Sequence, residues 1–211
     1  MDQVNENIVL ERDYRRFDQF ISRLVHDVYA EPPSDIHNLI TQNTLQALHS
    51  EGLLRPGMRA LDIGCGQGLA LEKFRALGVD VVGITLGPDV ATCRAKGLAV
   101  LEMDQNFMTF SAQEFDFLWC RHVLEHSVAP LFTLSEYKRV LKPGGLAYVE
   151  VPAPDTSAKH QENSNHYSVL PASAWLHLFA QAGFTVERKY ATEFTLTCGK
   201  DTYWSFYLRN R

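Results

Sequence analysis

Three glycines at alternate positions follow a short apolar run that ends beside Asp62. They are Gly64, Gly66 and Gly68, and residues 69–77 after them have helical spacing. This pattern predicts a buried strand, a tight turn and the start of a helix. Glycine lets a backbone adopt unusual torsions and approach a ligand closely. The G-x-G-x-G spacing differs from the G-x-G-x-x-G that seats a dinucleotide pyrophosphate.

Strand and helix patterns then alternate along the chain, which favours an α/β fold with a parallel sheet and helices on both faces. A polar stretch, residues 152–171, follows a predicted strand, at the edge where ligands of such sheets collect. We expect it to form part of a substrate wall. The predicted strands are residues 60–63, 79–85, 98–103, 115–120, 146–151, 184–190 and 202–208, the last two joined by a turn at 199–201. The predicted helices are residues 88–96, 131–141 and 172–182.

Two helices are predicted before the glycine turn, over residues 11–29 and 35–52, the second capped by Asp35. Tyr14, Phe17 and Phe20 belong to an aromatic stripe of the first helix, together with Tyr29. Such a stripe at helical spacing is more often part of a core. The alternative is an aromatic cover over a substrate.

Size and composition fit one α/β domain with a modest extra element. The 211 residues are 45% hydrophobic and carry a formal charge of -5, so the chain has no basic footprint for nucleic acid. We see no apolar run long enough to span a membrane and no secretory signal. Four scattered cysteines favour reduced thiols and a cytoplasmic protein.

Several strings together resemble class I S-adenosylmethionine-dependent methyltransferases of the small-molecule type. They occur in the family's order at residues 60–68, 82–86, 103–104, 115–126 and 139–145. The resemblance implies a Rossmann-like, seven-stranded, mostly parallel sheet with a final hairpin. It also implies that residues 53–211 bind S-adenosylmethionine and that the helices of residues 1–52 cover the active site. The cofactor contacts that it implies are Asp62, Gly64, Cys65, Gly66, Gly68, Thr85, Leu86, Asp104, Gln105, Cys120 and Arg121.

One position departs from the family pattern. Most members carry an acid at the end of the second strand, where it binds both ribose hydroxyls, whereas this chain has Thr85. A neutral hydroxyl gives no charge-assisted hydrogen bond. Cyclopropane-forming and tocopherol-type methyltransferases have a similar string here. Asp89 is a candidate substitute, although we favour its interpretation as a helix cap. The resemblance places Asp104 near the adenine amine; the alternative is an exposed loop acid.

The string His122-x-x-Glu125-His126 is the second informative feature. In a helical turn these residues would share a face. Small-RNA 3′-terminal and ubiquinone-biosynthesis O-methyltransferases resemble the chain here and bind a divalent metal. Together with His166, these residues would form a nitrogen-rich set of metal ligands suited to zinc, iron or manganese. The favoured alternative is a substrate pocket without metal, and the third is a structural role. His126 is our first candidate for a general base and His122 our second, because imidazole titrates near neutral pH.

The resemblance leads us to expect methyl transfer from S-adenosylmethionine to a small-molecule or sugar-like acceptor, at oxygen. The sulfonium would supply the activation, while the protein would position the acceptor and remove its proton. The alternative is a non-methylating regulatory or scaffold protein that binds the cofactor on the same fold. A nicotinamide-dependent oxidoreductase is disfavoured by the glycine spacing. The oligomeric state and the identity of the acceptor stay open.

Overall fold

The computed structural model describes residues 6–24 and 32–211, and side chains from residue 14 onward in those ranges. The helices are α1 (Glu6–Leu24), α2 (Asp35–Ser50), α3 (Leu69–Ala76), α4 (Asp89–Ala95), α5 (Pro130–Val140) and α6 (Ala172–Gln181), with short 3-10 turns η2 (Leu124–His126) and η3 (His160–Glu162). The strands are β1 (Arg59–Ile63), β2 (Asp80–Thr85), β3 (Val100–Glu102), β4 (Phe115–Arg121), β5 (Leu141–Pro152), β6 (Phe184–Leu196) and β7 (Gly199–Asn210). Across the described ranges, no helix is both long and apolar enough to cross a membrane.

The seven strands form one sheet in the order β3-β2-β1-β4-β5-β7-β6. The first five are parallel, and β7 pairs antiparallel with both β5 and β6. This confirms the Rossmann-like sheet and its final hairpin. The carboxyl ends of β1, β2 and β4 therefore meet at one edge, beside the reversal in strand order where ligands of open α/β sheets bind.

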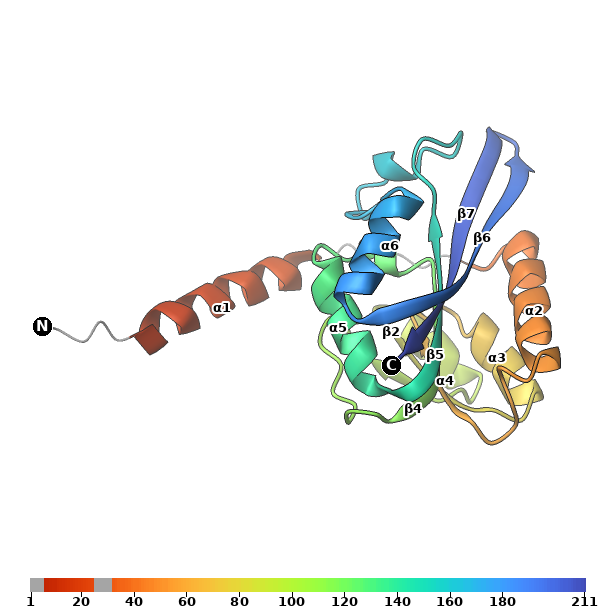
Figure 1. Cartoon of the computed structure of the whole chain (residues 1–211), viewed down its shortest axis with the longest axis horizontal. Helices are drawn as coiled ribbons and strands as arrows, with labels where there is room; N and C mark the ends of the chain where they lie inside the picture. The colour runs from red at the N-terminus through yellow and green to blue at the C-terminus, as the bar shows by residue number, and fades with distance from the viewer. Residues whose placement is uncertain (1–5, 25–31) are drawn as a thin grey trace, which may run out of the picture.

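Helices cover both faces of the sheet (Figure 1). Residues of α5 and α6 pack with β4, β5 and β7 in one apolar cluster, whose largest buried members include Trp175 and Phe179. Residues of α2, α3 and α4 form a second cluster on the other face, around Phe74 and Trp119. The alternation of side chains along β4 supplies both clusters, because Phe117 and Trp119 face one and Leu118 and Cys120 the other.

Three local predictions are corrected by the structure. The hairpin turns at residues 197–198, because Gly199 already pairs with Leu196 as the first residue of β7. The cap of α2 is Ser34, whose hydroxyl accepts the backbone N–H of His37, and not Asp35. The strand predicted at 146–151 begins earlier, because β5 starts at Leu141 and residues 142–145 form a bulge where its pairing with β4 shifts register.

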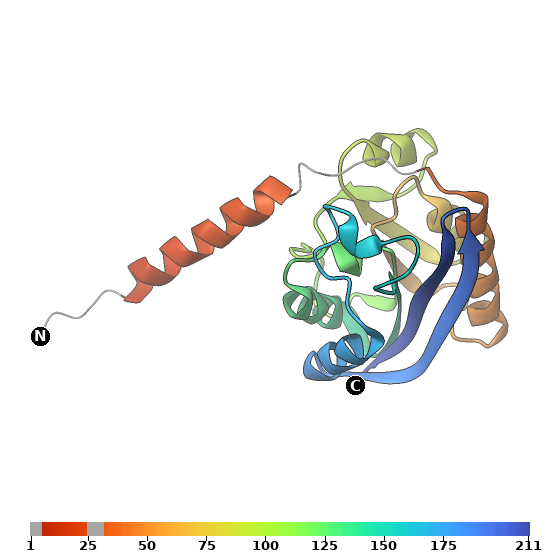
Figure 2. The same cartoon turned by 90° about the horizontal axis from the view of Figure 1, so that it is seen from above.

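Helix α1 differs most from the expectation. It extends away from the rest of the chain, as both views show (Figures 1 and 2). Tyr14, Phe17 and Phe20 are 72%, 40% and 43% exposed, so the interpretation of this stripe as core is wrong. Ile21, one position later, is buried. Tyr29 lies outside the described residues.

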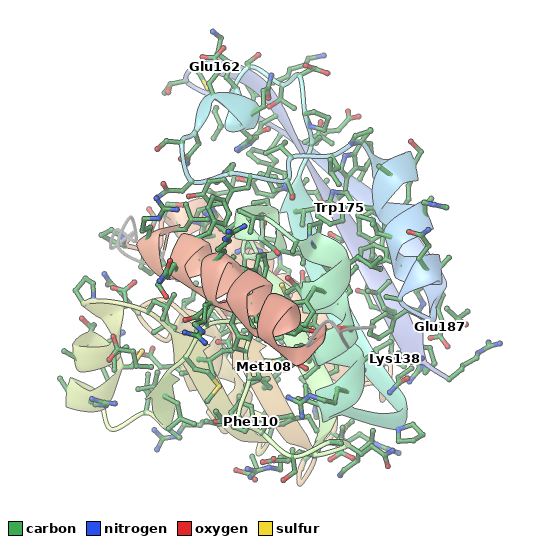
Figure 3. All side chains as sticks on the ribbon, turned by 90° about the vertical axis from the view of Figure 1, so that its left-hand side faces the viewer. Met108, Phe110, Lys138, Glu162, Trp175 and Glu187 are labelled. Carbon is green, nitrogen blue, oxygen red and sulfur yellow. The ribbon has the colours of Figure 1, made fainter. Side chains whose placement is uncertain are left out.

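The C-terminal strand fastens α5 to the sheet. Figure 3 shows Lys138 of α5 near the start of β6, where its ammonium donates to the Gly183 carbonyl. The buried amide of Asn210 donates to the carbonyls of Lys138, Leu141 and Lys142, at 3.2, 2.7 and 3.3 Å. One side chain thus supplies a donor to carbonyls at the end of α5 and the start of β5, where a helix leaves its last carbonyls without intrahelical partners.

We predict that Asn210→Ala lowers the free energy of unfolding by about 1–3 kcal/mol, because it removes a buried donor shared by three carbonyls. Asn43→Ala, on the exposed surface of α2, is the matched control and is expected to change stability by less than about 0.5 kcal/mol. Urea unfolding followed by circular dichroism measures both variants. Equal stability of the two would contradict the role given to Asn210.

Candidate functional site

A cavity of about 330 Å³ opens at the carboxyl edge of the sheet. Its volume lies in the range of small-molecule sites. The glycine turn, the ends of β2 and β4, α2 and the end of α1 all contribute to its walls. Most of the predicted contacts line it: Asp62, Gly64, Cys65, Gly66, Thr85, Leu86, Asp104, Gln105, Arg121, His122 and His126. Two of the predicted cofactor contacts do not: Gly68 is the N-cap of α3, and Cys120 is buried in the apolar core beside Tyr137.

The glycine turn has the backbone that the sequence predicts. Gly64, Gly66 and Gly68 all have positive φ, at 68°, 49° and 88°. A Cβ on Gly64 would meet the Val123 side chain at 2.2 Å, so this glycine is required by packing. The nearest atom to a Cβ on Gly66 would be Asp89 Oδ2, at 3.8 Å. The backbone at Gly66 therefore faces open space in the cavity.

Two buried carboxyl groups face the cavity near this turn. Asp62 is 2% exposed and Asp89 6%. Within the described residues, Asp62 Oδ2 and Asp89 Oδ1 have no hydrogen-bond partner. Burial raises the pKa of both groups, and that of Asp62 well above its usual range. The N-cap of α4 is Pro88, without a side-chain cap bond, so the interpretation of Asp89 as a helix cap is wrong.

The two polar residues after β3 behave differently. Asp104 Oδ1 accepts hydrogen bonds from the backbone and side-chain nitrogens of Asn106, at 2.7 and 2.8 Å. The amide of Gln105 donates to the Val123 carbonyl and accepts the hydroxyl of Tyr137. Asp104 thus shapes its own loop at the cavity wall, while the Gln105 side chain anchors the segment that follows β4.

The segment after β4 departs from the predicted helical turn. Only residues 124–126 form a turn, η2, and His122 precedes it with φ 57°, in the left-handed region. His122 Nδ1 lies 3.6 Å from Glu125 Oε1, and Nε2 lies 3.2 Å from Glu150 Oε1. Burial lowers the pKa of His122, but the two facing carboxylates outweigh it and raise the pKa overall. Both ring nitrogens therefore face acceptors.

His126 has a fixed tautomer. Its Nδ1 lies 2.9 Å from the backbone carbonyl of Asn165. A carbonyl can only accept, so Nδ1 carries the hydrogen and Nε2 keeps the lone pair. Asn165 belongs to the long segment between β5 and α6, which lies over the edge of the sheet in the view from above (Figure 2). The structure thus places Asn165, which belongs to the predicted substrate wall, in contact with His126, the predicted general base.

Three of the four predicted metal ligands come together. Single ligand atoms of Glu125, His126 and His166 lie within 4.8 Å of one another. His122 is not part of this group. Among the described residues, both carboxylate oxygens of Glu125 and Nδ1 of His166 lack a hydrogen-bond partner, although Glu125 is 1% exposed. Burial lowers the pKa of His166 to about 4, which keeps its imidazole neutral.

Sequence reasoning missed a buried carboxylate, Glu150, which is fully enclosed in β5. Its oxygens accept from Arg121 Nε at 2.5 Å, Tyr148 Oη at 2.6 Å and Ser205 Oγ at 3.1 Å. The Arg121 and His122 charges hold the pKa of Glu150 at about 2 despite its burial. The sequence signal for this site is a single acid inside the apolar run 146–151, because a charge buried in a strand requires partners.

Helix α2 and the β6–β7 hairpin also reach the site. Arg121 Nη1 donates to Thr41 Oγ1 at 3.1 Å, and both residues line the cavity together with His37. On the other side, His160 of η3 lies 3.0 Å from the buried carboxylate of Asp201. This contact fastens the segment that carries His166 to the start of β7.

The chain belongs to the methyltransferase domain family, which matches its residues 21–189. It is 36% identical over 102 residues to the ubiquinone biosynthesis O-methyltransferase of Cereibacter sphaeroides, covering 43% of this chain and 39% of that protein. It is 33% identical over 100 residues to the protein of the same name from Methylococcus capsulatus, covering 44% and 42%. The match thus spans about two fifths of each relative's length.

Solved structures show the same fold at low sequence identity. A SAM-dependent methyltransferase from Archaeoglobus fulgidus superposes with a TM-score of 0.65 at 18% identity, covering 80% of this chain and 94% of that one. The cyclase SpnF superposes with a TM-score of 0.67 at 19% identity, covering 80% of each chain. The fold is therefore shared with proteins of different named activities.

We predict an acid-sensitive contribution to stability from His37. Burial, with smaller effects of the His122 and Arg121 charges, lowers its pKa from 6.5 to about 4. The unfolded chain then binds a proton that the folded chain does not, so stability is lost as pH falls from 6.5 towards 4. His37→Asn should reduce the loss of stability between pH 7 and pH 5 in urea unfolding. His177→Asn, exposed on α6, should keep the wild-type loss; the same loss in His37→Asn would contradict the prediction.

Proposed function

We propose that the chain transfers a methyl group from S-adenosylmethionine to an oxygen atom of a small-molecule or sugar-like acceptor. The observation that carries this proposal is His126, which lines the cavity beyond the glycine turn with Nε2 available to accept a proton. The names of the relatives support oxygen as the acceptor atom, although the match covers only part of their length.

The residues present fit the cofactor that the family implies. Gly66 faces open space, and Asp62 and Asp89 offer buried oxygens without partners among the described residues. We assign the glycine turn and Asp62 to the methionine part, Thr85 and Asp89 to the ribose, and Asp104 to the adenine side. When bound, the cofactor supplies a methyl group activated by its sulfonium.

The protein's own residues then orient the acceptor and remove its proton. We assign the general base to His126, because the Asn165 carbonyl fixes its tautomer and its orientation. His122 was our second candidate for this role. Since both of its nitrogens face carboxylates, we assign it instead to pairing with Glu125 and Glu150 and to holding the strand end in place.

We propose that α2 and the end of α1, within residues 1–52, cover the active site and that residues 53–211 form the cofactor domain. Ile21 and Leu24 at the end of α1, and His37 and Thr41 of α2, line the cavity and support this division. We also propose a cytoplasmic location, supported by four free cysteines, three of them buried. The acidic composition supports a small molecule over nucleic acid as the partner.

A divalent metal at Glu125, His126 and His166 is a second candidate feature of the same reaction. It is favoured by the two Glu125 oxygens, which are buried without a hydrogen-bond partner within the described ranges. One carboxylate and two neutral imidazoles suit zinc, iron or manganese better than magnesium. His122 would not be a ligand in this arrangement. We favour the pocket without a metal, in which His126 acts as the base.

A non-methylating role is the remaining alternative, and the cyclase SpnF shows that the fold alone does not decide it. S-adenosylmethionine with a labelled methyl group, incubated with a panel of phenols and sugars, distinguishes methyl transfer from a non-methylating role. Transfer of the label that depends on His126 supports the proposal. Binding of the cofactor without transfer to any acceptor favours the alternative.

We predict that Asp89 contributes more to cofactor affinity than Thr85. Thr85→Val removes a neutral hydrogen bond and should weaken S-adenosylhomocysteine binding by about tenfold or less. Asp89→Asn removes a charge-assisted acceptor and should weaken it further. Calorimetry measures both variants, with Asp80→Asn, at the exposed start of β2, as the control. A larger loss for Thr85→Val than for Asp89→Asn would reverse the assignment of the ribose contact.

We predict that His126→Asn lowers methyl transfer by roughly a hundredfold or more, the usual contribution of a general base, with S-adenosylhomocysteine affinity unchanged. His177→Asn serves as the control. Elemental analysis and chelation then distinguish a general-base role of His126 from a metal-ligand role. Full activity after chelation leaves His126 as the base, whereas a loss that zinc, iron or manganese restores, and that Glu125→Gln reproduces, establishes the metal.

A further inference from the structure

Large apolar side chains that are exposed to solvent gather at two places near the cavity. One is the aromatic stripe on α1, and the other is a patch formed by the loop after β3 and the start of α5. Single exposed apolar residues are ordinary, whereas gathered ones mark an interaction surface. The stripe consists of Tyr14, Phe17 and Phe20, and the patch consists of Phe107, Leu131 and Phe132, all 40–72% exposed.

The helix face that carries the stripe continues into the cavity. Side chains three or four residues apart share one face of a helix. On α1 the residues at these intervals are Tyr14, Phe17, Ile21 and Leu24. The last two line the cavity. Because α1 extends away from the rest of the chain, the described part of that chain offers the exposed end of the stripe no apolar surface to pack on (Figure 2).

The patch adjoins the same cavity from the body of the domain. Phe107 follows Asn106, and residues 131–132 follow Val128 by three and four positions; Asn106 and Val128 line the cavity. The ring centroids of Phe107 and Phe132 are 5.5 Å apart, so the patch is one surface. Its side chains are 41–44% exposed with α1 in place. The α1 helix of the same chain therefore does not cover them.

The charges around the two surfaces are complementary. Residues 14–24 of α1 carry three arginines and one acid. Residues 102–106, which lead into the patch, carry Glu102 and Asp104 and no basic residue. Opposite charges on two surfaces favour their association and fix its orientation. The patch thus offers what α1 lacks, an apolar surface with an acidic border.

We propose that the chain forms a two-fold dimer in which α1 of each copy packs on the patch of the other copy. One symmetric arrangement then covers both surfaces of both copies and closes on itself. The two α1 helices run antiparallel to each other, each from its own cavity to the cavity of its partner. The proposal goes beyond methyl transfer and does not depend on it.

The exposed area reaches the lower limit of a specific interface. A large aromatic side chain buries about 150–250 Å². At 40–72% exposure, the six side chains of one copy therefore offer on the order of 100 Å² each. Two copies together bury on the order of 1,000 Å², the size at which specific association begins. We expect a dimer that dissociates in the micromolar range.

Sedimentation equilibrium of the whole 211-residue chain tests the dimer. At about 100 μM, well above a micromolar dissociation constant, the wild type should have twice the mass of one chain. Phe17→Asp on the stripe and Phe132→Asp on the patch should each weaken association roughly hundredfold or more, because each replaces two buried apolar contacts per dimer by charges. Leu39→Asp, at an exposed leucine of α2, is the matched control and should stay dimeric. A monomeric wild type would overturn the proposal.

Mixing the two variants distinguishes the exchange of α1 from pairing of α1 with itself. Each variant alone has both contacts of its dimer damaged. A mixed pair keeps one contact intact, between α1 of the Phe132→Asp chain and the patch of the Phe17→Asp chain. The equimolar mixture should therefore associate at lower concentration than either variant. A dimer that Phe17→Asp breaks and Phe132→Asp leaves unchanged would overturn the exchange in favour of paired α1 helices.

A lipid surface is the other occupant that suits an aromatic helix face with arginines. Co-sedimentation with vesicles of phosphatidylcholine and phosphatidylglycerol tests it with the same variants. A wild type that binds the vesicles as a monomer, and loses this binding in Phe17→Asp, would assign the stripe to lipid and overturn the dimer. A dimeric wild type that does not bind the vesicles supports the exchange.

Discussion

The side of the cavity that holds Arg121 and His122 depends on the buried carboxylate of Glu150. A fully buried carboxylate is stable only when opposite charges and hydrogen-bond donors surround it. Here the partners come from β4, β5 and β7, and through Arg121 the network reaches Thr41 of α2. The same bonds that neutralise Glu150 also aim Arg121 and His122 at the cavity. Removing this acid would leave Arg121 and His122 without the partner that orients them.

The opposite wall depends on a second buried acid, Asp201. It holds His160, while the backbone N–H of Ser157 donates to the carbonyl of Lys200, so two contacts fasten the segment after β5 to the β6–β7 hairpin. That segment places the carbonyl of Asn165 within hydrogen-bond distance of His126 Nδ1. Asp201 lies beyond residue 189, where the family match ends. The antiparallel hairpin, remote from the glycine turn in sequence, thus helps to set the tautomer of the proposed base.

The sheet and the glycine turn could be predicted from the sequence because local signals specify them: apolar runs, helical spacing and glycines that need positive φ. The side of the cavity around Arg121 and His122 could not, because it depends on pairings between distant strands. Glu150 is separated from its partner Arg121 by α5, and the left-handed backbone of His122 interrupts the helical face predicted for it. The stripe with Phe17 and Phe20 has core-like spacing, but spacing alone does not say whether the remaining chain covers it.

The bond from His126 to the Asn165 carbonyl has the same consequence for a base and for a metal ligand. With Nδ1 protonated, Nε2 holds the ring's available lone pair. A metal on Nε2 would occupy the electron pair that accepts the acceptor's proton, so one His126 cannot perform both roles at once. With a metal bound, deprotonation would have to come from the lowered pKa of the acceptor hydroxyl itself. The neighbouring carboxylate of Glu125, buried beside both His122 and His126, would stabilise either cation, the imidazolium or the metal.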